Sequence, residues 1–282
     1  VLLRHTDKPA PLVIAPPASA QTRVSGQTWP SIFSDADPAP KSLLELAQAS
    51  KNFQLDESKA QASLITRKTQ GDKVWWVFAN DYGSPASLSG RRAACSAASA
   101  LMQFGGNGLT RDELSRRMEM LKATWNISLS GIYLEVPRNN LQEAFAILFS
   151  VWKDPLLPVH EFNSYKSGLI TYFESQLKNS VSLADNASRL RFDNFPSGHW
   201  SKPQNFEAQI AETKALNYED VKRCIGDFAE ISHARLGVVG NLQESEVRAL
   251  WSKLVISAPA TFSYQRVPEP QAPSVEIGRA HV

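Results

Sequence analysis

Hydrophobic and polar positions divide this chain into a strand-rich stretch and a later helix-rich stretch. Lys73 to Ala79 is a run of aromatic and β-branched residues, KVWWVFA, which is typical of a central strand buried on both faces. Ala123 to Ser130 alternates with period two, which predicts a half-buried strand. Ile132 to Val136 alternates in phase with it, so the turn at Gly131 predicts a hairpin. Other short apolar runs predict strands at 63–66, 234–241 and 261–267.

Helical spacing of apolar residues dominates the rest of the chain. The clearest case is Leu141 to Lys153, whose apolar side chains fall on one helical face before Asp154-Pro155 stops the helix. Further helices are predicted at 43–49, 91–104, 110–122, 158–177, 182–192, 218–228 and 244–254, with a polar loop at 194–207. Because strands and helices are grouped apart, the pattern predicts the α+β class, a sheet with helices packed on one face.

The stretch from Arg91 to Leu114 combines a small-residue helix, a glycine turn and a capped second helix. The first helix is rich in Ala and Ser, so another element can approach it closely. Gly105, Gly106 and Gly108 end that helix, as glycine does where positive φ is needed. Thr110 then stands three residues before Glu113, the spacing of a capping box.

Composition narrows the functional classes. The chain has 282 residues, 43% of them hydrophobic, and a net charge of +2 from 30 basic and 28 acidic residues. This balance of charges argues against a dedicated nucleic-acid surface. The chain contains no run of about 18 apolar residues, so no membrane-spanning helix is predicted. The simplest interpretation of Cys95 and Cys224 is two buried thiols that pack as small hydrophobic side chains, with a disulfide as the less favoured alternative.

Changes in composition along the chain predict three parts. Residues 1–57 are read as a proline-rich linker with a short helix capped by Ser42, and 58–268 as the folded domain. Residues 269–282 are read as the start of a further segment, of which 277–282 resembles translated sequencing adapter. The chain begins with Val, and its proline-interrupted start favours a linker or fragment boundary over a signal peptide.

The order and spacing of several segments, from about Ser58 to Pro268, resemble the insulinase/pitrilysin family of zinc metallopeptidases. These segments are Thr66–Thr69 with Gly71 and Val74, Gly105–Leu114, Asn140–Phe162, Leu216–Val221, and Gly237–Asn241, where Asn241 stands for the family's Asp. Active members carry the motif H-x-x-E-H on the helix before the glycine turn. Aligning the family's glycine with Gly105 places the motif positions at Ser96, Ser99 and Ala100, none of which can bind zinc or act as a general base. The third ligand position falls near Thr171 or Tyr172, with Glu174 close by.

The resemblance implies no catalytic or metal-binding residue in this segment. We expect His160, His199 and His233 to be surface or capping residues rather than a metal set, and His5 and His281 lie in the terminal segments. Ser96 lacks the strained turn and adjacent base of a nucleophile, and the 105–108 glycines lack the Lys-Ser/Thr ending of a phosphate loop, so a helix C-cap is predicted there. We expect both Trp75 and Trp76 to lie in the core.

As a member of such a family, this segment would be the non-catalytic C-terminal half of a zinc endopeptidase, or part of it. It would help to form a chamber around peptide substrates, while zinc would sit in a separate N-terminal half. The binding residues are left open, and a periplasmic location is expected by resemblance only. The alternative is a non-enzymatic structural or regulatory subunit of the same fold.

Overall fold

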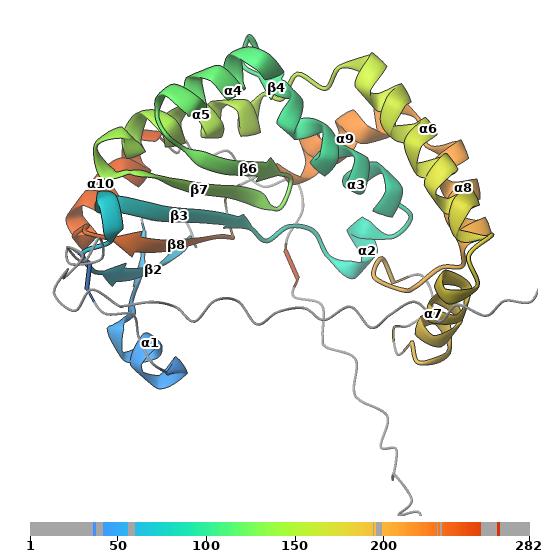
Figure 1. Cartoon of the computed structure of the whole chain (residues 1–282), viewed down its shortest axis with the longest axis horizontal. Coiled ribbons are helices and arrows are strands. Elements are labelled where there is room, and N and C mark those ends of the chain that lie inside the picture. The colour runs from blue at the N-terminus through green and yellow to red at the C-terminus, as the bar shows by residue number, and fades with distance from the viewer. Residues whose placement is uncertain are drawn as a thin grey trace, which may run out of the picture. The chain divides into compact units, whose positions relative to one another are not determined.

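The computed structural model describes residues 36–37, 42–55, 60–193, 195, 199–229, 231, 233–254 and 264–265. Within this part of the chain a six-stranded mixed sheet has the order β1-β2-β8-β3-β7-β6 (Figure 1). Its strands are β1 (Lys51–Gln54), β2 (Gln61–Thr66), β3 (Lys73–Asn80), β6 (Thr124–Ser128), β7 (Gly131–Pro137) and β8 (Ala234–Gly240). Of these neighbouring pairs only β2 and β8 run parallel. The last strand in sequence, β8, lies at the centre of the sheet between β2 and β3.

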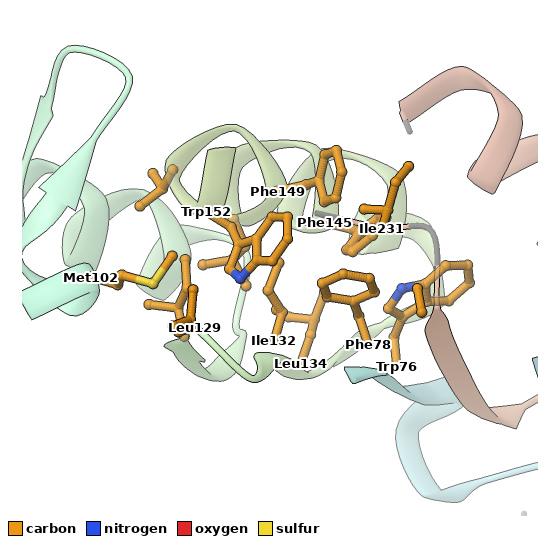
Figure 2. Close-up of a cluster of buried hydrophobic side chains, with 14 of the residues drawn as sticks. Trp76, Phe78, Met102, Leu129, Ile132, Leu134, Phe145, Phe149, Trp152 and Ile231 are labelled. Atoms are coloured by element: carbon orange, nitrogen blue, oxygen red, sulfur yellow. The ribbon is translucent and has the colours of Figure 1, made fainter. Parts of the chain in front are cut away.

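One face of the sheet carries the hydrophobic core. The predicted hairpin is confirmed as β6 and β7, with Ile127 opposite Ile132. Ile132, Leu134 and Val136 are all buried, as their period-two spacing predicted. Figure 2 shows how Trp76 and Phe78 of β3 meet the aromatic side chains of α5 (Leu141–Lys153) above this face. The ring of Phe78 lies edge-on to that of Trp152, with centroids 5.1 Å apart.

The opposite face of β3 is not buried, which corrects the prediction of a strand covered on both sides. Buried and more exposed positions alternate along β3, and Val77 is 39% exposed. Trp76 lies fully in the core, whereas Trp75 is half-buried on the open face and donates a hydrogen bond to Glu135. The expectation that both tryptophans are core residues was therefore wrong for Trp75. An all-apolar run does not reveal which face a sheet leaves open.

The helices confirm most of the sequence prediction and place the structure in the α+β class. Besides α5 they are α1 (Leu43–Ala49), α2 (Pro85–Leu88), α3 (Arg92–Leu101), α4 (Arg111–Met120), α6 (Val159–Gln176), α7 (Ser180–Arg191), α8 (Phe206–Ala215), α9 (Tyr218–Phe228) and α10 (Glu244–Leu254), with short 3-10 turns η1 (Gln70–Asp72), η2 (Met102–Phe104) and η3 (Arg138–Asn140). The predicted caps are confirmed: Ser42, Thr110 and Asn217 each accept a backbone N–H at a helix start. Helices α2 and α8 and strand β1 were not predicted: β1 pairs with β2 although it lies in the stretch 1–57 expected to be linker and a short helix, and α8 begins inside the expected polar loop. The strand expected at 261–267 lies outside the described residues except for Tyr264 and Gln265, which are not in a strand.

The glycine-rich turn forms a small hairpin as well as a cap. Gly105 ends η2 with φ +108°, as expected of a capping glycine, but β4 (Gly105–Gly106) then pairs with β5 (Leu109–Thr110). The backbone N–H of Asn107 donates to the carbonyl of Asp154 at 2.8 Å. A Cβ on Gly106 would stand 2.3 Å from that same carbonyl oxygen, so only glycine permits this approach. This main-chain hydrogen bond thus holds the end of α5 against the turn that follows α3.

Candidate functional site

Helix α3, which carries the three aligned motif positions, is built to be approached closely. Its buried face consists of small side chains and one leucine: Ala94, Cys95, Ala97, Ala98 and Leu101. Ser96 is exposed, and Ser99 and Ala100 are partly exposed on the other side of the helix. From α8, a carboxylate oxygen of Glu212 accepts the backbone N–H of Ala93 at 3.2 Å, which satisfies a donor in the first turn of α3.

A disulfide holds α3 in place, and this corrects the expectation of two separate thiols. Cys95 of α3 is bonded to Cys224 of α9, and their Cα atoms lie 5.4 Å apart. Both side chains are buried, as expected, but the sequence offered no measure of the distance between them. The small residues of α3 bring the two helix backbones close enough for the bond, because disulfides require Cα atoms within about 4.4–6.8 Å.

The two serine positions on α3 open into a pocket of about 510 Å³. Arg91 and Arg92 at the start of the same helix also line it, and its other walls come from separate segments: Tyr82 follows β3, and Trp200 precedes α8. Burial raises the pKa of the Tyr82 phenol, so this side chain stays protonated at neutral pH. Among the described residues the Ser96 hydroxyl has no hydrogen-bonded base, and the arrangement is a polar recess rather than an activated nucleophile.

The positions aligned with the third zinc ligand do not face α3. Thr171 and Tyr172 of α6 are exposed, and Glu174 lies 3.9 Å from the ammonium of Lys214 on α8. A second recess of about 230 Å³ separates α3 from α6, and the α6 side chains that line it are Tyr165, Leu169 and Phe173. The α6 face toward Ser96 is therefore apolar and aromatic.

The three histidines considered as a metal set lie in separate places. His160 is exposed at the start of α6, 3.5 Å from Glu161. His199 is buried, with its ring stacked on Phe195 and its Nδ1 accepting the N–H of Ser201. His233 precedes β8 and its ring contacts that of Tyr264. Across the ranges that the structure describes, no three His, Cys, Asp or Glu side chains are grouped so as to hold a metal ion.

The open face of the sheet is a second candidate surface. Trp75, Val77 and Tyr133 lie on it, and the carboxylate of Glu135 accepts hydrogen bonds from Lys73 at 2.6 Å and from Trp75 at 3.2 Å. The hydrogen bond from Lys73 is the main cause that lowers the pKa of Glu135 below its ordinary value. Large, partly exposed apolar side chains on a sheet face mark a surface suited to contact with another chain.

The two edges of the sheet differ. Strand β1 carries Lys51, which pairs with Glu244 at 2.7 Å, and Arg248 donates to the carbonyls of Gln54 and Leu55. Strand β6, TWNIS, has no charged residue, and among the residues that the structure describes it has a ladder partner, β7, on one side only. Helix α3 and the turn η2 pack next to β6. Natural sheets protect edges with charges, so β6 is the edge better suited to pair with an added strand.

Sequence reasoning missed Tyr82, Arg92, Trp200 and Glu212, which line the two recesses beside the N-terminal part of α3. They come from four separate segments and share no motif. Tyr82, Trp200 and Glu212 lie outside the predicted helices and strands, where binding residues are often found, whereas Arg92 lies inside the predicted helix 91–104 and gave no such signal. None of the described helices combines the length and apolarity needed to span a bilayer.

Comparison with known proteins gives structural matches without sequence matches. No protein-family model and no curated protein sequence matches the chain. A peptidase M16 inactive domain from Pseudomonas fluorescens is 14% identical with a TM-score of 0.61, and the match covers 78% of this chain and 54% of that one. A protease from Helicobacter pylori is also 14% identical with a TM-score of 0.54, covering 79% of this chain and 53% of that one.

A third match is a mutant of the ferredoxin protease FusC in complex with Arabidopsis ferredoxin, at 14% identity and a TM-score of 0.56. That match covers 86% of this chain and 26% of the protease. The chain thus spans about half the length of the first two structures. At this level of identity the similarity concerns the fold alone: the chain has the same α+β fold as the matched peptidase M16 inactive domain, which is the fold that its sequence resemblance implied.

Proposed function

We propose that this chain belongs to the non-catalytic half of a zinc-dependent endopeptidase and forms part of the wall around its peptide substrate. The observation that carries the proposal is the chemistry of α3. Ser96, Ser99 and Ala100 occupy the aligned motif positions on the accessible side of this helix, and none of them is a zinc ligand. Zinc and the water it activates would then belong to a separate N-terminal half.

The open sheet face and the β6 edge support a role in holding peptide. An extended peptide can add to a free edge strand through main-chain hydrogen bonds, with side-chain contacts adding selectivity. Strand β6 offers an uncharged edge beside α3, and Tyr133 of the neighbouring strand is 37% exposed on the open face. One matched protease was crystallised with a protein, ferredoxin, which supports protein or peptide substrates here.

The Cys95–Cys224 disulfide supports a location in an oxidising compartment, and we propose the periplasm or an equivalent space. A thiol-trapping assay on protein taken directly from cells tests this placement. Protection of both cysteines from alkylation is expected, and quantitative alkylation without reductant would contradict it.

The decisive experiment measures zinc content and peptide hydrolysis for this chain and for the full product of its gene. The proposal expects this chain to be zinc-free and inert, and the full product to be active and inhibited by chelators. If the full product is also zinc-free and inert, the alternative of a structural or regulatory subunit replaces it. Stoichiometric zinc and peptide cleavage by this chain alone would overturn the alignment of Ser96, Ser99 and Ala100 with the motif.

Peptide capture at β6 has a separate test that leaves the protein unchanged. An extended peptide that binds by strand addition should lose affinity when alternate amide nitrogens are methylated, because methylation removes the donors on one edge. The same peptide methylated on the intervening amides is the matched control. Equal affinity for both methylated peptides would argue against strand addition.

A further inference from the structure

The pocket beside α3 has the size of a ligand site and walls from three segments. Its volume is about 510 Å³, within the range of about 300–1,000 Å³ usual for small-molecule sites. Tyr82 forms one aromatic wall and Trp200, which is 39% exposed, forms another. The ring of His199 stacks on that of Trp200 with centroids 6.2 Å apart, which braces this wall.

The charge lining the pocket is positive. Two guanidinium groups line it, and no carboxylate does among the described residues. Arg91 forms an ion pair with Asp227, so its charge is balanced. Arg92 donates to the carbonyl of Lys202 at 2.9 Å and forms no ion pair within the described ranges. The nearby Glu212 lines the neighbouring recess between α3 and α6, which Arg92 also borders, and accepts the N–H of Ala93.

Hydroxyl groups complete the polar side of the pocket. Ser96 and Ser99, one helical turn apart, line it together with Ser201. None of these three hydroxyls has a hydrogen-bond partner among the residues that the structure describes. A guanidinium with unused donors and neighbouring hydroxyls suits an anion with two oxygens, because arginine binds carboxylates through two parallel N–H bonds.

We propose that this recess, which we name the Arg92 pocket, binds a carboxylate attached to an apolar or aromatic group of a peptide. Arg92 and the serine hydroxyls hold the carboxylate, and Tyr82 and Trp200 enclose the apolar part. The carboxylate comes either from the C-terminus of a peptide or from an acidic side chain next to an apolar one. The peptide as ligand rests on the proposed function, whereas the preference for a carboxylate rests on the pocket alone.

Calorimetric titration of the 282-residue chain with three acetylated tripeptides tests the proposal. The first ends in phenylalanine with a free carboxylate, the second is its C-terminal amide, and the third is an amide that carries glutamate next to phenylalanine. We expect the free acid to bind about tenfold or more tightly than its amide, since a hydrogen bond to a charged group contributes about 1.5–3 kcal/mol, which corresponds to that ratio. Tighter binding of the glutamate peptide than of the free acid would assign the carboxylate to a side chain, and the reverse order would assign it to the C-terminus.

Matched variants locate the binding. Arg92→Gln should abolish the preference for the acid, and Arg116→Gln, an exposed arginine of α4, should leave it unchanged. Ser99→Glu, which places a negative charge on the pocket wall and keeps Arg92, should also abolish it, with circular dichroism confirming that each variant is folded. Equal affinity for all three tripeptides, no binding of any of them, or an unchanged preference for the carboxylate peptides in Arg92→Gln would overturn the proposal. These outcomes leave the zinc and hydrolysis test of the proposed function unaffected.

Discussion

The sulfur atoms of Cys95 and Cys224 are bonded to each other, and this bond joins α3 to α9 across 129 residues of sequence. Helix α3 carries the aligned motif positions and one wall of the Arg92 pocket. The disulfide therefore fixes the helix that carries both of these features. A helix of mainly small residues buries little apolar surface, so packing alone stabilises its position only weakly. The covalent link to α9 compensates for this limited contact area.

We expect reduction of this disulfide to lower the free energy of unfolding by about 2–5 kcal/mol, because the bond closes a long loop and restricts the unfolded chain. Urea unfolding with and without reductant measures the difference. The double variant Cys95→Ala/Cys224→Ala should be less stable by a similar amount and should not respond to reductant. Equal midpoints for oxidised and reduced protein would contradict the disulfide.

Adjacent tryptophans of β3 should respond differently to truncation. Trp76 is fully buried in the core, so Trp76→Ala should cost about 3–5 kcal/mol of stability through lost contacts and a cavity. Trp75→Ala removes a half-buried ring on the open face and its hydrogen bond to Glu135, and should cost about 1 kcal/mol. Chemical denaturation of the two variants provides the comparison. Similar losses for both would mean that β3 is buried on its two faces after all.

The Glu135 network should make stability depend on pH. The folded-state pKa of Glu135 is lowered, first by the hydrogen bond from Lys73, so the carboxylate favours the folded state. This stabilisation is fully present above the ordinary pKa of glutamate, about 4.3, and is lost as pH falls through the lower folded-state pKa. Urea unfolding of wild type and Glu135→Gln should show a difference at pH 7 that shrinks at about pH 3. A difference that grows toward acid would reverse the sign of the effect.

Replacing each of two glycines by alanine should change the stability of the protein in opposite directions. Gly106→Ala places a Cβ 2.3 Å from the carbonyl oxygen of Asp154 and should destabilise the protein by about 1–3 kcal/mol. Gly226→Ala, in the last turn of α9 with open space around it, should raise stability by about 0.5–1 kcal/mol, since alanine favours helix. Thermal unfolding midpoints should move in opposite directions. A tolerated Gly106→Ala would mean that the turn does not approach the end of α5 this closely.

Structural features that depend on residues close together in the chain could be predicted from the sequence. The capping box of Thr110 and Glu113 and the cap at Asn217 depend on side chains three residues from the backbone groups they satisfy. The alternation of Ile132, Leu134 and Val136 identified a half-buried strand, because the strand period is two. Helix α8 escaped prediction because, of its ten residues, only Phe206 and Thr213 are buried, which leaves little apolar periodicity to detect.

Relationships between distant segments were decided by the tertiary structure alone. The run KVWWVFA is apolar on both sides of the strand, so only the packing of α5 against one face determined that Trp76 is buried and Trp75 half-exposed. Likewise, residue spacing carries no information about the distance between Cys95 and Cys224. The sequence determined that the α3 motif positions hold no zinc ligand, because that is a matter of residue identity. The Arg92 pocket, assembled from separate segments, exists only where the folded chain brings their side chains together.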